Sequence, residues 1–121
     1  MATESSRSDL PWEVRQKAAA VEGELAAYEA YVVLQCSRVT AGGPVSSVTH
    51  AHLPSMCRRY LALRPHAERD VLELVTAHRM LFGELLRHRS GVRDDRLAKA
   101  RDRHSAVLRA LHESLRTRLA S

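Results

Sequence analysis

The chain has 121 residues, of which 45% are hydrophobic and 4% are aromatic; this size excludes an enzyme with a second lobe, and the aliphatic composition favours helices over a sheet. It contains no apolar run of the roughly 20 residues needed to cross a bilayer, and its N-terminus lacks the apolar centre of a secretory signal. The formal net charge is +5, and the positive excess lies in residues 87–121, which hold ten basic and four acidic side chains.

Apolar residues at alternating steps of three and four predict a first long helix over about residues 10–39. Residues 1–8 are small and polar and are expected to form a disordered tail, and Asp9 is the expected N-cap. Trp12 stands at the very start of this helix, where its ring could cover the end of a bundle or anchor a partner. The apolar stripe consists of Leu10, Val14, Ala18, Val21, Leu25, Tyr28, Val32, Cys36 and Val39.

The link after this helix begins with Gly42, Gly43 and Pro44, which end the helix. Residues 53–63 can then form a short extra helix with Pro54 in its first turn, where a missing N–H is tolerated.

Two histidines and a cysteine near this link raise the question of a metal site. His50 and His52 are two residues apart, and Cys57 follows five residues later. A zinc site needs three or four ligands at suitable spacing, and no C-x-x-C or H-x-x-x-H with matching partners is present. We therefore expect surface histidines in a loop, no metal and no cofactor. Cys36 and Cys57 are expected to be buried, reduced thiols.

Two further stripes predict long helices over about residues 65–89 and 94–119. Gly91 marks the stop between them, and Asp94 or Asp95 is expected to cap the last helix. The second stripe consists of Ala67, Val71, Leu74, His78, Leu81 and Leu85. The third stripe consists of Leu97, Ala100, His104, Leu108, Leu111, Leu115 and Leu119.

Apolar stripes exposed to water would be costly, so the three helices must bury them against one another or against a partner. The short loop near residue 90 makes the second and third helices antiparallel neighbours, and the longer link lets the first helix dock along both. The predicted fold is all-α: an antiparallel three-helix bundle over residues 9–121, with the short extra helix over residues 53–63.

His78 and His104 fall within the stripes, where either could act as a catalytic base. A histidine in a helical seam is more often a neutral core residue with one hydrogen bond, and the sequence does not place a nucleophile or carboxylate opposite either ring. No glycine-rich phosphate loop is present. We therefore interpret both histidines as core residues and expect that the protein is not an enzyme.

The basic last helix is the other candidate for function. A solvated helix face is the simplest interpretation, an acidic protein partner or an anionic membrane surface comes second, and a phosphate backbone comes third. Nucleic acid ranks third because no aromatic residue follows Phe82 to stack on bases. The candidate partner-surface residues are Trp12, Arg96, Arg103, Arg109 and Arg116.

Two segments resemble a known family. The first helix opens with Trp12-Glu13-Val14-Arg15-Gln16-Lys17-Ala18 and continues with Val21-Glu22-Gly23-Glu24-Leu25. This resembles the opening of the Golgi Qb-SNAREs, a tryptophan-led helix followed by a Leu-Glu-x-Glu-Leu step, with Val21 in place of a leucine and one residue fewer after Glu13. The last helix contains Arg103-His104-x-x-Val107-Leu108 followed by Leu111 and Leu115, which is similar to the family's third helix.

This resemblance covers about a third of the chain and implies the N-terminal, Habc-like three-helix domain of a Golgi Qb-SNARE. The family's SNARE segment and membrane anchor are absent from these residues. The resemblance therefore implies a regulatory domain on the cytoplasmic face of Golgi membranes, which binds SNARE segments or tethering or regulatory proteins and contacts the membrane only through a segment absent here.

The sequence leaves three other functions open. The chain could be a stand-alone helical adaptor or scaffold subunit whose stripes complete a partner's bundle. It could also be a basic helical nucleic-acid-binding protein, or a small helical enzyme that uses His78 and His104. We expect a monomer in solution.

Overall fold

The structure, a computed structural model, describes residues 11–46 and 48–120. Within these residues the chain forms four α-helices and no strand. The helices are α1 (Trp12–Thr40), α2 (Val48–Leu63), α3 (Glu68–Arg89) and α4 (Arg96–Ala120). The expected tail over residues 1–8 and the expected cap at Asp9 lie outside the described residues. None of the described helices is long and apolar enough to span a membrane.

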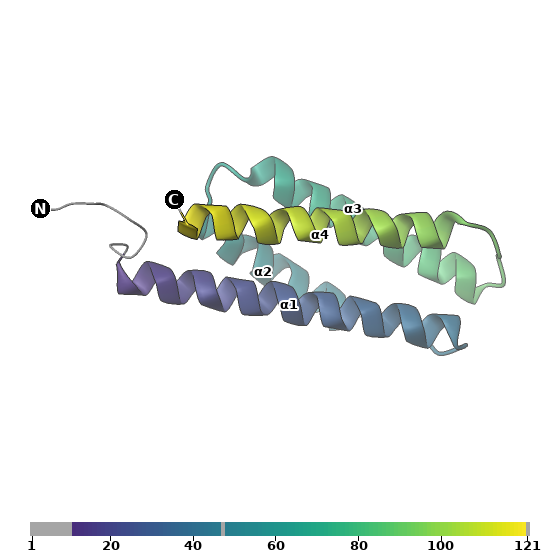
Figure 1. Cartoon of the computed structure of the whole chain (residues 1–121). Coiled ribbons are helices and arrows are strands. Elements are labelled where there is room, and N and C mark those ends of the chain that lie inside the picture. The colour runs from purple at the N-terminus through teal and green to yellow at the C-terminus, as the bar shows by residue number, and fades with distance from the viewer. Residues whose placement is uncertain (1–10, 47, 121) are drawn as a thin grey trace, which may run out of the picture.

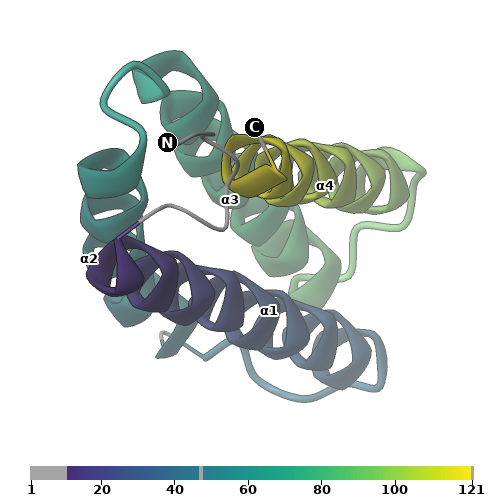
Figure 2. The same ribbon diagram turned by 60° about the vertical axis from the view of Figure 1, so that its left-hand side comes forward.

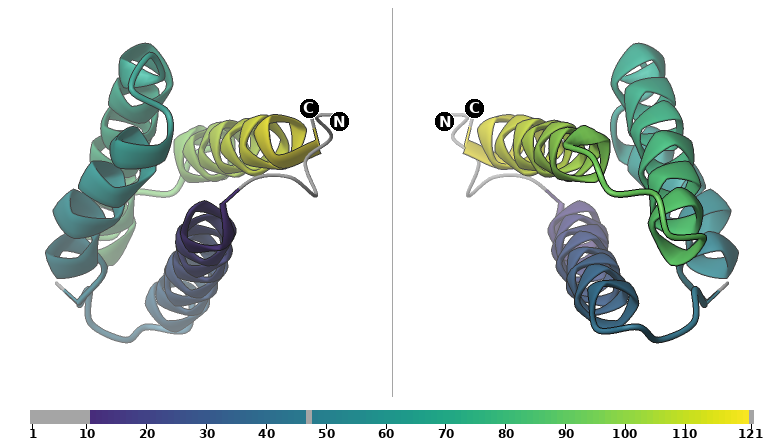
Figure 3. Two further views of the ribbon diagram at one scale, coloured as in Figure 1. Left: turned by 90° about the vertical axis from the view of Figure 1, so that its left-hand side faces the viewer. Right: turned by 90° about the vertical axis from the view of Figure 1, so that its right-hand side faces the viewer.

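The four helices form an up-and-down bundle in two layers. Each helix runs antiparallel to the one before it, and α1 and α4 lie in front of α2 and α3 (Figure 1). The views from the two ends show the same two layers (Figure 3). The most extensive packing joins α3 to α4 and α1 to α2 (Figure 2).

The prediction of an all-α bundle with three long helices and a short extra one is confirmed. The long helices α1, α3 and α4 have 29, 22 and 25 residues, and the short α2 has 16. The described stripe residues are buried along most of each helix, and only Val14 and Leu97, at the helix starts, are half-buried. The stripes therefore bury one another within a single chain.

Helix α2 starts earlier than the sequence indicates. It begins at Val48, so His50 and His52 lie on a helix, and Pro54 lies in its interior rather than in its first turn. The prediction of a loop at these histidines is wrong because both rings contact a long helix. His50 packs against Phe82 with ring centroids 4.5 Å apart, and His52 stacks on Tyr31 at 5.8 Å.

Glycine and aspartate end and start the helices as the sequence predicts. Gly42 has a φ of 93° and Gly91 a φ of 101°, a backbone region that side chains with a Cβ rarely occupy. The side chain of Asp94 accepts a hydrogen bond from the backbone N–H of Arg96 at 3.0 Å, which caps α4. Helix α3 begins three residues after Pro65, at Glu68.

Helix α2 is a full member of the core and not a surface appendage. It buries four side chains against the long helices: Leu53, Met56, Cys57 and Tyr60. The Tyr60 hydroxyl also donates a hydrogen bond to the carbonyl of Leu111 on α4 at 3.1 Å. This bond satisfies the polar end of a ring that is only 1% exposed.

Candidate functional site

One side chain from each helix meets in a polar cluster at the centre of the bundle. The Tyr28 hydroxyl on α1 lies 2.6 Å from Nδ1 of His78 on α3 and 2.8 Å from Nε2 of His104 on α4. Nε2 of His78 lies 2.6 Å from Nδ1 of His50 on α2. Tyr28, His78 and His104 are buried, whereas His50 is exposed. We call these four residues the histidine–tyrosine cluster.

Neutral imidazoles satisfy every contact in this cluster. A neutral imidazole has one donor and one acceptor nitrogen, and a phenol can donate once and accept as well. If His104 donates to the Tyr28 oxygen, Tyr28 donates to Nδ1 of His78, and His78 donates to His50. The reverse order satisfies the same three contacts. The cluster therefore needs no charge to complete its hydrogen bonds.

Burial keeps the three buried members of the cluster uncharged. It lowers the pKa of His78 to about 4, with a further contribution from the neighbouring His50 and His104, and it lowers the pKa of His104 to about 4. Burial, together with the nearby Cys57 thiol, raises the pKa of Tyr28. The sequence-based interpretation of both histidines as buried core residues is confirmed, although His78 makes two hydrogen bonds rather than one.

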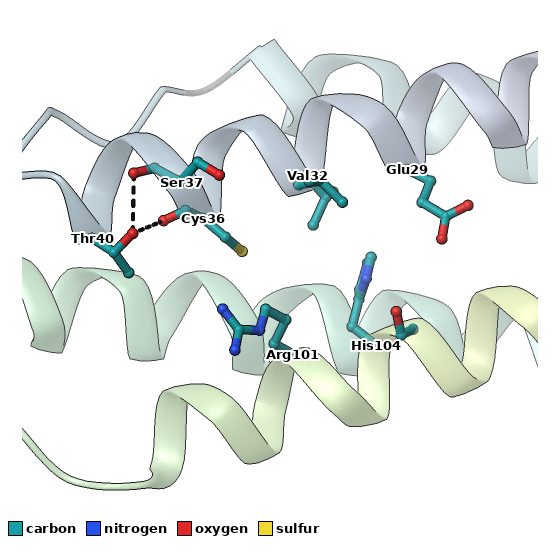
Figure 4. A pocket seen from close by; sticks show the side chains of 9 residues that line it. Glu29, Val32, Cys36, Ser37, Thr40, Arg101 and His104 are labelled. Atoms are coloured by element: carbon teal, nitrogen blue, oxygen red, sulfur yellow. Dashed lines mark hydrogen bonds between the residues drawn. The ribbon is translucent and has the colours of Figure 1, made fainter.

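A small pocket of about 130 Å³ lies beside the cluster, between α1 and α4. Figure 4 shows Cys36 pointing from α1 toward α4, and Arg101 and His104 pointing from α4 toward α1. Burial raises the pKa of the Cys36 thiol, and the positive charge of Arg101 only partly opposes this. Because the thiolate is the reactive form, this pocket does not present an activated nucleophile. Cys57 is likewise a buried free thiol.

An apolar groove of about 520 Å³ runs between α2 and α3 on the outside of the bundle. We call it the α2–α3 groove. Its walls are His50, Leu53, Pro54 and Cys57 from α2 and Val75, His78, Arg79, Phe82, Gly83 and Leu86 from α3. His50 and His78 belong both to this groove and to the histidine–tyrosine cluster. The groove is therefore the solvent-facing side of that cluster.

The basic residues of α4 divide between its two flanks. Arg96 pairs with Glu84 of α3 at 3.2 Å, and Arg103 contacts the Met80 sulfur of α3 at 3.5 Å. On the other flank Arg116 pairs with Glu22 of α1 at 3.3 Å. Arg109 lines a polar groove between α1 and α4 that also includes Glu29 and Glu113. These four arginines therefore do not form one continuous track for a phosphate backbone.

Trp12 is 61% exposed at the start of α1. The ring does not cover the end of the bundle, so that interpretation is wrong. Its role as an anchor for a partner stays a prediction.

The histidine–tyrosine cluster and the α2–α3 groove were not anticipated from the sequence. One signal for the cluster was present: a residue with a polar ring or hydroxyl near the middle of each stripe, at Tyr28, His78 and His104. No comparable signal pointed to the groove.

Comparison with known protein families, curated proteins and solved structures finds no match to this chain.

Proposed function

We propose that this chain is a non-catalytic recognition domain that binds helical segments of other proteins, in the manner of the regulatory N-terminal domain of a Golgi Qb-SNARE. The observation that carries the proposal is the arrangement of α1, α3 and α4. These three long helices follow one another in the order of the family's N-terminal domain, and α2 is added between the first and second of them.

The residues that carry the family resemblance support this proposal. Val21 and Leu25 on α1 are 2% and 1% exposed, and His104 and Leu108 on α4 are 3% and 0% exposed. These four positions are thus core positions of two helices that pack together, whereas Trp12 is exposed and Val14 and Val107 are half-buried. Residues that specify how the helices pack are expected to be shared by domains that share this fold, even when the domains bind different partners.

A recognition role, rather than catalysis, also suits the polar groups of the bundle. His78 and His104 are uncharged at neutral pH, and the hydrogen bonds of the cluster join its own members. A general base needs to reach a proton on a bound substrate, and both ring nitrogens of His78 and Nε2 of His104 are occupied by Tyr28 and His50. The proposed location is the cytoplasmic face of Golgi membranes, and the proposed partners are SNARE segments or tethering or regulatory proteins.

The test is direct binding between the purified chain and purified SNARE segments of Golgi SNAREs from the same organism. We expect one segment to bind with one-to-one stoichiometry in calorimetry, and a peptide of the same composition in scrambled order not to bind. If a folded, monomeric chain binds none of the segments, the SNARE proposal is wrong.

A stand-alone adaptor is the second candidate, and the α2–α3 groove favours it, since an open apolar groove can accept a helix from any protein. It predicts that the chain binds amphipathic helices unrelated to SNAREs and that a fluorescently tagged copy is found away from the Golgi. Binding to SNARE segments together with a Golgi location would contradict the adaptor alternative.

A further inference from the structure

We propose that the α2–α3 groove is the docking site for one amphipathic helix of a partner protein, with a carboxylate of that helix placed against Arg79. This inference rests on the proposed recognition function and names the surface and the chemistry of its occupant.

The spacing of the groove walls fits a helix. On α3 the wall residues Val75, Arg79, Phe82 and Leu86 follow one another at steps of four, three and four. On α2 the wall residues His50, Pro54 and Cys57 follow at steps of four and three. Side chains at this spacing form a ridge along one face of each helix, and the space between two such ridges accepts the side chains of a third helix.

Apolar side chains remain exposed along this side of α3. Leu86 is 56% exposed in the groove wall, and Leu72, one turn before Val75, is 64% exposed. With the half-buried Val75 between them, these two leucines lie along one side of α3, and apolar side chains grouped in this way are typical of an interaction surface. A docked helix with leucines at steps of three and four would cover them.

Gly83 gives a second, independent indication that a helix docks in the α2–α3 groove. It lies in the interior of α3, where glycine is a poorer helix former than alanine. A Cβ added at this position would meet nothing within 4 Å, so the packing of the chain itself does not require a glycine. A residue without a side chain lets the backbone of another helix approach closely. We infer that Gly83 allows the backbone of the partner helix to approach α3 closely.

Arg79 defines the charge of the occupant. It is the only arginine, lysine, aspartate or glutamate among the groove walls, and it has no ion-pair partner in the part of the chain that the structure describes. A carboxylate on the docked helix would provide one. A second copy of this chain is a poorer occupant, because antiparallel pairing of α3 with itself over residues 72–86 would bring two Arg79 side chains together at the centre of the contact.

The experiment uses the whole chain and a synthetic helix as probe. The probe is a peptide of about three heptads, with leucine at the a and d positions and glutamate on the flanks, and a scrambled peptide of the same composition is its control. In NMR titrations of the isotope-labelled chain, we expect saturable shifts of Leu53, Val75 and Leu86. Shifts centred on α1 and α4, or no saturable shift, would overturn the inference.

Matched glycine variants separate the groove from helix stability. Gly83→Leu fills the groove, whereas Gly23→Leu places the same side chain on an exposed part of α1 where a Cβ also meets nothing within 4 Å. We expect Gly83→Leu to weaken probe binding about tenfold or more, equivalent to about 1.4 kcal/mol, and Gly23→Leu to leave it unchanged. Leu86→Gln, a change at an exposed site, is the second groove variant and is also expected to weaken probe binding. Thermal unfolding of each variant checks that it folds. Equal binding by all three variants would overturn the inference.

A charge reversal tests the role of Arg79. Arg79→Glu is expected to weaken binding of the glutamate-flanked probe and to strengthen binding of a lysine-flanked version, while Arg38→Glu, at an exposed position on α1, changes neither. Binding that responds equally to both reversals would contradict a carboxylate at Arg79. The groove assignment and the recognition function can fail separately. If Gly83→Leu does not weaken binding of a SNARE segment, the groove assignment is wrong but the recognition function is still supported.

Discussion

The hydroxyl oxygen of Tyr28 lies 2.6 Å from Nδ1 of His78, and these two side chains, on helices α1 and α3, are 1% and 2% exposed. Apolar contacts between two helices tolerate sliding and rotation, because the hydrophobic effect is not directional. A hydrogen bond has a narrow range of distance and angle. The pair therefore fixes the register of α1 against α3, and the contacts with His104 and His50 extend this constraint to α4 and α2.

We predict that the chain loses stability as the pH falls from about 6.5 to about 4. Folding lowers the pKa of His78 and His104 to about 4, whereas an unfolded histidine titrates near 6.5. Between these values the unfolded state binds more protons, so the free energy of unfolding rises with pH through this window and is fully recovered above it. Each histidine is expected to contribute a loss of about 3 kcal/mol across the window.

Urea-induced unfolding at pH 7, 6 and 5 measures this dependence. The control is His66→Gln, because His66 is exposed in the link between α2 and α3 and lies outside the histidine–tyrosine cluster. A free energy of unfolding that stays constant from pH 7 to pH 5 would contradict the burial of two neutral histidines.

Tyr28→Phe tests the hydroxyl itself. The substitution keeps the ring and leaves two buried imidazole nitrogens without a partner, at a cost of about 1–3 kcal/mol for each. Tyr31 on the same helix is 44% exposed, and Tyr31→Phe is expected to change stability by less than about 0.5 kcal/mol. Equilibrium unfolding of both variants at pH 7 makes the comparison. Equal stability of the two would mean that the Tyr28 hydroxyl does not hold the bundle together.

The sequence predicts the burial of the cluster but not its geometry. Tyr28, His78 and His104 each occupy a stripe position, and a stripe position is buried whichever helix covers it. Whether three such residues meet depends on the rotation of each helix and on its displacement along its axis. Steps of three and four do not specify either quantity, so the hydrogen bonds could not be predicted.

The same reasoning explains which other features of the structure could be predicted from the sequence and which could not. The ends of α1 and α3 follow from the sequence because Gly42 and Gly91 adopt positive φ values by a local preference. The start of α2 depends instead on contacts of His50 and His52 with rings on other helices. The α2–α3 groove depends on the space between two helices, to which no local pattern corresponds.

Leu74→Ala tests the position of the second stripe. Leu74 is 1% exposed, and its truncation in the core is expected to cost about 2–5 kcal/mol of unfolding free energy. Leu72 lies two residues away on the same helix and is 64% exposed, so Leu72→Ala is expected to cost less than about 0.5 kcal/mol. Chemical denaturation of both variants measures the difference. Similar costs at the two positions would mean that α3 is rotated relative to the fold described above.

Gly23→Ala is predicted to stabilise the chain. Gly23 lies in the interior of α1, it is exposed, and a Cβ at this position meets nothing within 4 Å. Alanine is a better helix former than glycine by about 1 kcal/mol, chiefly because the unfolded chain loses less backbone entropy on folding. The expected result is a higher midpoint in urea with an unchanged dependence on denaturant concentration. The same gain is expected for Gly83→Ala, so a stabilised Gly23→Ala beside a destabilised Gly83→Ala would show that Gly83 serves the fold of the chain rather than the approach of a partner.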